Sequence, residues 1–225
     1  MPKQDFLMRL LEQLQGVLPY ILDLTKTGDY AEAHAVVDQA VREVAGVSTA
    51  GLVRLADREI LAGLRRDQTL AWDEKAYFLA VLLKEDAAVY EKQADEPRAF
   101  RRNLKALHLF IRLFLESEDG AEHTAVIREL LGKLDDYILP GASYALILRY
   151  YETAGDYARA EDVLFTWWEN EAEMFAPDAP SAAEAGAAFY ERILQKSDAE
   201  LIAGNLPRAE AEAGRAELLD GIVDE

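Results

Sequence analysis

Three histidines are the side chains of this chain best suited to metal binding or proton transfer: His34, His108 and His123. None of them belongs to a His-Glu-x-x-His zinc pattern, and no Glu-x-x-His pair of the di-iron type occurs. The sequence has no cysteine, which excludes thiolate metal sites and disulfide bonds. An isolated histidine on a helix is more often a surface or hydrogen-bonded residue than a ligand. We therefore expect no metal site and no cofactor.

Hydroxyl nucleophiles are equally poorly placed for catalysis. No serine stands in a Gly-x-Ser-x-Gly elbow, and the chain has neither a P-loop nor a dinucleotide fingerprint. Ser181 and Ser197 stand at expected helix starts, where capping of the backbone explains them. Carboxylates are abundant, but sequence alone does not show which of them converge in a cleft. These observations favour a protein that is not an enzyme.

A set of basic side chains stands out against the acidic background. Over the helix expected after Pro97, these side chains fall within about 120° of one face at roughly 100° per residue: Arg98, Arg101, Arg102, Lys105, His108 and Arg112. One interpretation is a cationic groove for an acidic peptide, a carboxylate or a phosphate. The other, which the acidic excess favours, is that this face pairs with acidic neighbouring helices.

The adjacent pair Trp167 and Trp168 is another candidate contact. Neighbouring residues of a helix point about 100° apart, so both rings rarely bury on one face. One ring could then meet a partner, since large aromatics are frequent interface anchors. The alternative is that the pair packs against a C-terminal helical hairpin.

Composition limits the classes of function further. The 225 residues are 51% hydrophobic, enough for a core, and 42 acidic residues against 24 basic ones give a net charge of -18. A field of that sign repels nucleic acid and anionic membranes. The longest apolar run, 76–83, is far shorter than a membrane span of about 20 residues. With no signal-peptide pattern at the start, we expect a cytoplasmic protein that binds neither membrane nor nucleic acid.

The elements that carry these residues are helices throughout. Apolar residues recur at spacings of three and four, and strand-like alternation is scarce. The pattern predicts a nearly all-round apolar central helix over about 72–93, and further helices separated by short connections, such as 30–44 and 142–153. Short connections make neighbouring helices antiparallel. We expect an all-α fold of helical hairpins in a single domain, 1–225.

One hexapeptide occurs twice in almost the same form. Gly-Asp-Tyr-Ala-Glu-Ala begins at Gly28 and Gly-Asp-Tyr-Ala-Arg-Ala begins at Gly155, each between two expected helices. Both segments resemble the turn between helix A and helix B of a tetratricopeptide repeat, in which a small residue five places after the glycine lets the helices approach. Ala33 and Ala160 occupy that place. Trp167 departs from the repeat, which has a small residue there.

This resemblance implies antiparallel hairpins stacked as a tetratricopeptide-like right-handed superhelix. Recognisable hairpins cover about 5–46 and 142–175, with a weaker third over 181–219. The resemblance also implies that helix A residues line a concave surface that binds a protein or peptide partner: Gln15, Leu22, Lys26, Arg149 and Glu152. The chain would then be a non-enzymatic protein–protein interaction module, a scaffold or adaptor.

Two further features leave alternatives open. The N-terminal apolar stripe, from Phe6 to Ile21, is wide enough for a homodimer seam, which would make the chain a self-associating structural protein. A helical cavity could instead bind a small molecule. The N-terminal Asp-Phe-Leu-Met-Arg and the C-terminal Gly-Asn-Leu-Pro-Arg-Ala-Glu-Ala-Glu also resemble an uncharacterised bacterial all-α family, which brings no known activity with it.

Overall fold

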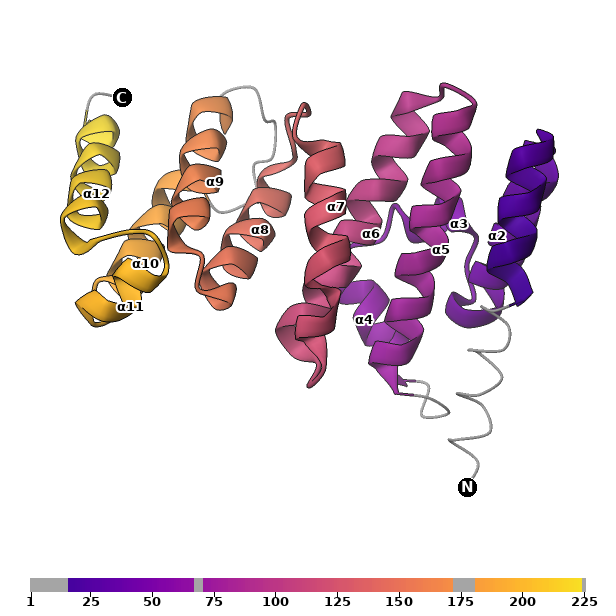
Figure 1. Ribbon diagram of the computed structural model, residues 1–225, viewed down its shortest axis with the longest axis horizontal. Helices are drawn as coiled ribbons and strands as arrows, with labels where there is room; N and C mark the ends of the chain where they lie inside the picture. The colour runs from indigo at the N-terminus through magenta and orange to yellow at the C-terminus, as the bar shows by residue number, and fades with distance from the viewer. Residues whose placement is uncertain (1–15, 67–70, 172–180, 224–225) are drawn as a thin grey trace. The chain divides into compact units, whose positions relative to one another are not determined.

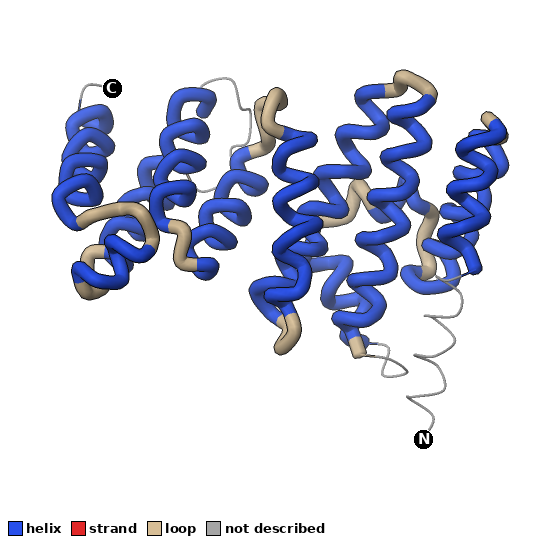
Figure 2. The backbone as a smooth tube through the Cα atoms, viewed as in Figure 1, coloured by secondary structure: helices blue, strands red, loops and turns tan. Residues whose placement is uncertain are grey.

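The computed structural model describes residues 16–66, 71–171 and 181–223, and every regular element in these ranges is a helix (Figure 1). Figure 2 shows the same helices joined mainly by short loops, with no strand in the described part of the chain. The prediction of an all-α fold is therefore confirmed. None of the described helices combines the length and the apolar character needed to cross a membrane.

The chain divides into two compact units, Met1–Asp136 and Tyr137–Glu225, and each is described by itself. The expectation of a single domain over 1–225 stays a prediction. The hairpin predicted over 5–46 lies in the first unit, with residues 5–15 outside the described ranges. The hairpin over 142–175 lies in the second unit, and residues 172–175 are likewise outside.

The first unit is built around two long helices, α5 (Trp72–Lys92) and α6 (Glu96–Glu116). The other elements described in this unit are the helix over 16–27, α2 (Tyr30–Ala45), α3 (Thr49–Leu52), α4 (Asp57–Arg66), the 3₁₀ turn η1 (Gly120–His123) and α7 (Thr124–Leu134). Helix α2 packs on α5, and α7 packs on α6. Helix α5 buries residues on almost every side, as its apolar middle predicts.

The second unit consists of α8 (Gly141–Ala154), α9 (Tyr157–Asn170), α10 (Ala182–Ile193), α11 (Asp198–Ala203) and α12 (Arg208–Val223). Helix α9 packs on both α8 and α10, and α10 packs on α12. Gly186 makes this packing close, because a Cβ there would collide with the side chains of Leu164 and Leu218. Helix α10 is thereby fixed against its neighbours by one face.

The repeated hexapeptide forms the same turn in both copies. Gly28 and Gly155 have φ of 85° and 77°, the left-handed region that glycine adopts without strain. The amide of the next residue donates to the carbonyl five residues back, Asp29 to Leu24 at 2.9 Å and Asp156 to Tyr151 at 3.0 Å. Ala33 and Ala160 are fully buried, as the close approach of the helices requires. The predicted hairpin turns are therefore present.

A third turn has the same geometry and was not predicted. Ala94, between α5 and α6, has φ of 56°, and the amide of Asp95 donates to the carbonyl of Tyr90 at 3.0 Å. The amide of Ala99 then donates to the carbonyl of Asp95 at 3.0 Å, and Ala99 is buried like its counterparts Ala33 and Ala160. Sequence comparison missed this copy because alanine replaces glycine at the turn.

A candidate binding groove between α8 and α10

A groove of about 300 Å³ lies within the second unit, between α8 and α10. Helix α8 contributes positions spaced as i, i+3, i+4 and i+7, which share one helical face, and α10 contributes positions spaced as i, i+1, i+4 and i+8. The lining residues are Ala145, Leu148, Arg149 and Glu152 from α8, and Glu184, Ala185, Ala188 and Arg192 from α10. Among the described residues, the lining of the groove therefore comes from these two helices.

Local sequence explains why α10 presents this face. Ser181 caps the helix by accepting a hydrogen bond from the amide of Glu184, and the Glu184 carboxylate accepts one from the amide of Ser181. This capping box fixes where the helix begins. Gly186 is buried against α9 and α12, so the lining alanines, Ala185 and Ala188, fall on a different side of α10.

The charged end of the groove centres on Glu152. Its carboxylate accepts two hydrogen bonds from Arg192, from Nε at 2.7 Å and from Nη2 at 2.8 Å. A second guanidinium, that of Arg149, lies 3.3 Å from the same carboxylate. The Glu152 side chain is buried, whereas those of Arg149 and Arg192 are 55% and 44% exposed. The hydrogen bond to Glu152 is the main reason that the pKa of Arg192 is raised. One carboxylate thus faces two cations.

The remainder of the groove is apolar until Glu184. Three alanines and the buried Leu148 make up this part of the lining. Glu184 is exposed and stands eight residues before Arg192 on the same helix, which is about 12 Å along the axis at 1.5 Å per residue. The groove therefore has a cationic end, an apolar middle and an acidic residue at the other end. Such a surface suits an amphipathic segment.

Two of the concave residues implied by the sequence, Arg149 and Glu152, lie together in this groove. Leu22 and Lys26 are exposed on the helix over 16–27, which belongs to the first unit. Gln15 lies outside the described residues, and so does most of the N-terminal apolar stripe. The four described residues of this set are therefore divided between the two units.

The two tryptophans have different surroundings. Trp167 is 1% exposed and lies in the core, with its ring stacked on Tyr144 at a centroid distance of 6.3 Å. It fits where the repeat has a small residue because Gly141 of α8 faces it: a Cβ added there would lie 3.2 Å from the indole Nε1. Trp168 is half-buried beside Phe165. Only Trp168 of this pair retains surface that a partner could touch.

The basic set on α6 is largely paired with acids of the first unit. Arg102 and Lys105 are buried; Arg102 Nε donates to Asp86 at 2.6 Å and Lys105 Nζ to Asp57 at 2.8 Å. His108 also lies against Asp57, at 3.0 Å. Burial alone would raise the pKa of Asp57, but the His108 hydrogen bond and the charges of His108 and Lys105 hold it well below its usual range. These contacts fit the pairing interpretation of the basic face.

The outer members of the basic set have local partners. Arg98 pairs with Asp95 at 3.0 Å, and Arg112 pairs with Glu116 at 3.4 Å. Arg101 is exposed, and its Nε donates to the carbonyl of Pro97 at 3.1 Å. The α6 face therefore contributes mainly to cohesion among α4, α5 and α6.

A second polar cluster in the first unit escaped sequence reasoning. His34 Nδ1 lies 2.6 Å from Asp86 Oδ1, and the His34 ring stacks on Tyr90 at 4.0 Å. Gln93 Nε2 lies 2.8 Å from His34 Nε2, which leaves both ring nitrogens engaged. His34 and Asp86 stand 52 residues apart, so no local pattern could have joined them. Within the described residues, no group of three or more His, Asp or Glu side chains could hold a metal ion.

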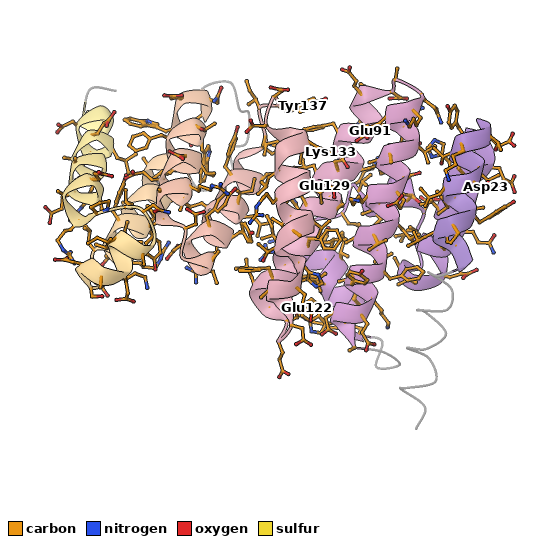
Figure 3. The ribbon with its side chains drawn as sticks, viewed as in Figure 1. Asp23, Glu91, Glu122, Glu129, Lys133 and Tyr137 are labelled. Carbon is orange, nitrogen blue, oxygen red and sulfur yellow. The ribbon has the colours of Figure 1, made fainter. Side chains whose placement is uncertain are left out.

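Ion pairs at the surface of the first unit link α7 to α5. Figure 3 labels Glu91 and Lys133, whose charged groups lie 2.9 Å apart, and Glu129, which pairs with Lys84 at 3.2 Å. Glu91 also accepts a hydrogen bond from Asn103 of α6 at 2.9 Å. These residues join helices of the first unit to one another.

Comparison with known proteins yields one match. The model of a family of unknown function (DUF6483) matches residues 1–221, almost the whole chain. No curated protein and no solved structure matches the chain.

Proposed function

The chain belongs to the DUF6483 family of unknown function, and we propose that it is a non-enzymatic protein–protein interaction module that presents the α8–α10 groove to a peptide or protein partner. The hairpins stack, in this proposal, in a tetratricopeptide-like right-handed arrangement. Three turns that combine this geometry with a buried alanine five places later, at Gly28, Ala94 and Gly155, support that arrangement.

The observation that carries the proposal is the composition of the groove. Its apolar middle offers surface to bury, and its charged ends, Arg149 and Arg192 at one and Glu184 at the other, can fix the register of a bound segment. The volume, about 300 Å³, suits a few side chains of a partner. Arg149 and Glu152 are also two of the five positions that the repeat resemblance assigns to a binding surface.

A peptide selected from a random display library, followed by chemical-shift mapping, tests this proposal. Peptides that bind the full-length chain are selected, and the tightest one is titrated into protein with 13C-labelled alanine and leucine methyl groups. We expect the largest shifts at the four apolar lining residues, Ala145, Leu148, Ala185 and Ala188, because their methyl groups would contact the peptide.

Ala187 gives the internal control for this map. It lies on α10 beside Ala188 but is exposed and outside the groove, so its methyl signal should move little. Shifts confined to α6 or to the helix over 16–27 would contradict the proposal, as would a library that yields no binder.

A further inference from the structure

The middle of the groove decides which backbone conformation a bound segment can have. Its lining there is Ala145, Leu148, Ala185 and Ala188, none of which has a side-chain hydrogen-bonding group. An extended peptide would lay its amides and carbonyls over this surface and lose water without gaining a partner. An α-helix satisfies its own backbone and offers a stripe of apolar side chains to the groove. The lining therefore favours a helical partner.

One of the two arginines at the cationic end can also pair with a partner. Arg192 forms a bidentate pair with Glu152, which neutralises that carboxylate. Arg149 makes a single, longer contact of 3.3 Å with it and is the more exposed of the two arginines. A carboxylate from a partner can thus meet Arg149 without disturbing the Glu152–Arg192 pair.

The two helices run in the same direction along the groove. The pair between Glu152 and Arg192 joins the last turns of α8 and α10, while Glu184 lies in the first turn of α10. The cationic end is therefore the carboxyl end of both helices, whose dipoles place partial negative charge there. A partner helix that runs antiparallel to them brings its own positive amino end to this place.

The same orientation suits the charges of the partner. An acidic side chain in the first turn of a helix and a basic one in its last turn both stabilise the helix that carries them. Two positions seven residues apart share a face and are separated by about 10.5 Å, close to the span of about 12 Å from Glu184 to Arg192. The guanidinium of Arg149 contacts the same Glu152 carboxylate as that of Arg192, so an acid that meets Arg149 would place a base seven residues later near Glu184.

We infer that the groove binds an amphipathic α-helix that runs antiparallel to α8 and α10, an inference that rests on the proposed function. This partner carries an acidic residue in its first turn, a basic residue seven positions later, and small apolar side chains between them. The groove selects its partner by the order of these two charges along the helix.

Two stapled helical peptides of identical composition test the inference. Both carry the same apolar stripe; one has glutamate first and lysine seven positions later, and the other has the reverse order. The staple makes their helicity equal, so a difference in affinity reports the charges of the groove. By fluorescence anisotropy at low salt, we expect the acid-first peptide to bind the full-length protein about tenfold more tightly, given a few-fold effect for each exposed pair.

Three variants show which residues of the groove cause the preference for the acid-first peptide. Arg149→Gln and Glu184→Gln should each reduce it from about tenfold to about threefold, since each removes one of the two charged contacts. Glutamine at position 184 still supports the capping box, so the start of α10 is preserved. Arg159→Gln is the matched control, because Arg159 is 53% exposed and paired three residues away, as Arg149 is, but lies outside the groove.

The outcomes separate this inference from the proposed function. Equal binding of the two peptides, a preference for the base-first peptide, or no binding of either would overturn the inference. Each would leave the proposed function standing if the library-selected peptide still maps to the α8–α10 methyl groups. An unchanged tenfold preference in Arg149→Gln and Glu184→Gln would also overturn it.

Discussion

The half-buried carboxylate of Glu161 shows how one residue can link stability to pH. Tyr190 donates its hydroxyl hydrogen to Glu161 at 2.6 Å, between α10 and α9. Burial is the main reason that the pKa of Glu161 is raised above its ordinary value of 4.5, and the charges of Asp162, Glu210 and Glu217 add to the effect. Gly214 of α12 faces this pair so closely that a Cβ would collide with both side chains. The fold therefore favours the protonated form of Glu161.

The sign of this linkage gives an expectation for Glu161→Gln. Because the folded-state pKa is raised, the contribution of Glu161 to stability is complete below the unfolded-state pKa and is lost as pH rises through the folded-state value. Glutamine cannot ionise and still accepts the hydrogen bond from Tyr190. We expect the variant to be more stable at pH 8, by less than about 1 kcal/mol because the group is partly exposed.

Urea unfolding between pH 4.5, the ordinary pKa of a glutamate, and pH 8 measures this effect. The gain from Glu161→Gln should shrink toward pH 4.5, whereas Glu169→Gln, at an exposed position of the same helix, should show no such trend. A loss of stability at pH 8 would be inconsistent with the account of Glu161.

The turns between helices are the elements on which sequence and structure agree best. Gly28 and Gly155 and the alanines that follow them specified the turn geometry because each constraint is local: a left-handed residue, then a buried small residue. The end of α5 was expected near Gln93 and lies at Lys92, although the left-handed turn at Ala94 that follows it was not predicted. The existence of the helices, and the position of the turns that contain glycine, could therefore be predicted from the chain alone.

The candidate site was only half predictable. Arg149 and Glu152 follow from their positions in a recognisable repeat, but Arg192 and Glu184 come from α10, where the repeat pattern is weak. The pair between Glu152 and Arg192 joins residues 40 positions apart, and tertiary packing alone brings them together. The burial of Trp167 could not be predicted from nearby residues, because it depends on Gly141 at the start of the preceding helix.

The third turn offers a test of the shared geometry. Ala94 occupies the left-handed region, which is strained for alanine, and its side chain is exposed, so Ala94→Gly removes strain without removing packing. We expect a gain of about 0.5–1 kcal/mol, limited by the greater freedom of glycine in the unfolded chain. Gly28→Ala should cost about 1 kcal/mol, since a Cβ there meets no atom within 4 Å and only the backbone is strained.

Thermal or urea unfolding of the two variants measures these changes in stability. Opposite signs are expected for Ala94→Gly and Gly28→Ala. A destabilised Ala94→Gly variant would show that the turn between α5 and α6 is held differently from the turn at Gly28.

The whole molecule is strongly acidic, and this shapes what the groove can recruit. In Tyr137–Glu225, acidic residues outnumber basic ones about three to one. In the proposed function, that field would attract partners that are basic overall, while the cationic end at Arg149 and Arg192 would accept a single acidic side chain. Long-range charge would then favour encounter with the partner, and the charges of the groove would select the orientation of the bound helix.

Filling the α8–α10 groove with a large side chain shows whether this groove binds a partner. Ala188→Phe places a large ring in the apolar middle, whereas Ala187→Phe places the same ring at the exposed neighbouring position. Affinity for the library-selected peptide is measured for both variants by calorimetry, after circular dichroism shows equal helix content. We expect Ala188→Phe to weaken binding at least tenfold and Ala187→Phe to change it less than about twofold, since only the first blocks the contact surface. Equal affinities for the two variants would contradict the account.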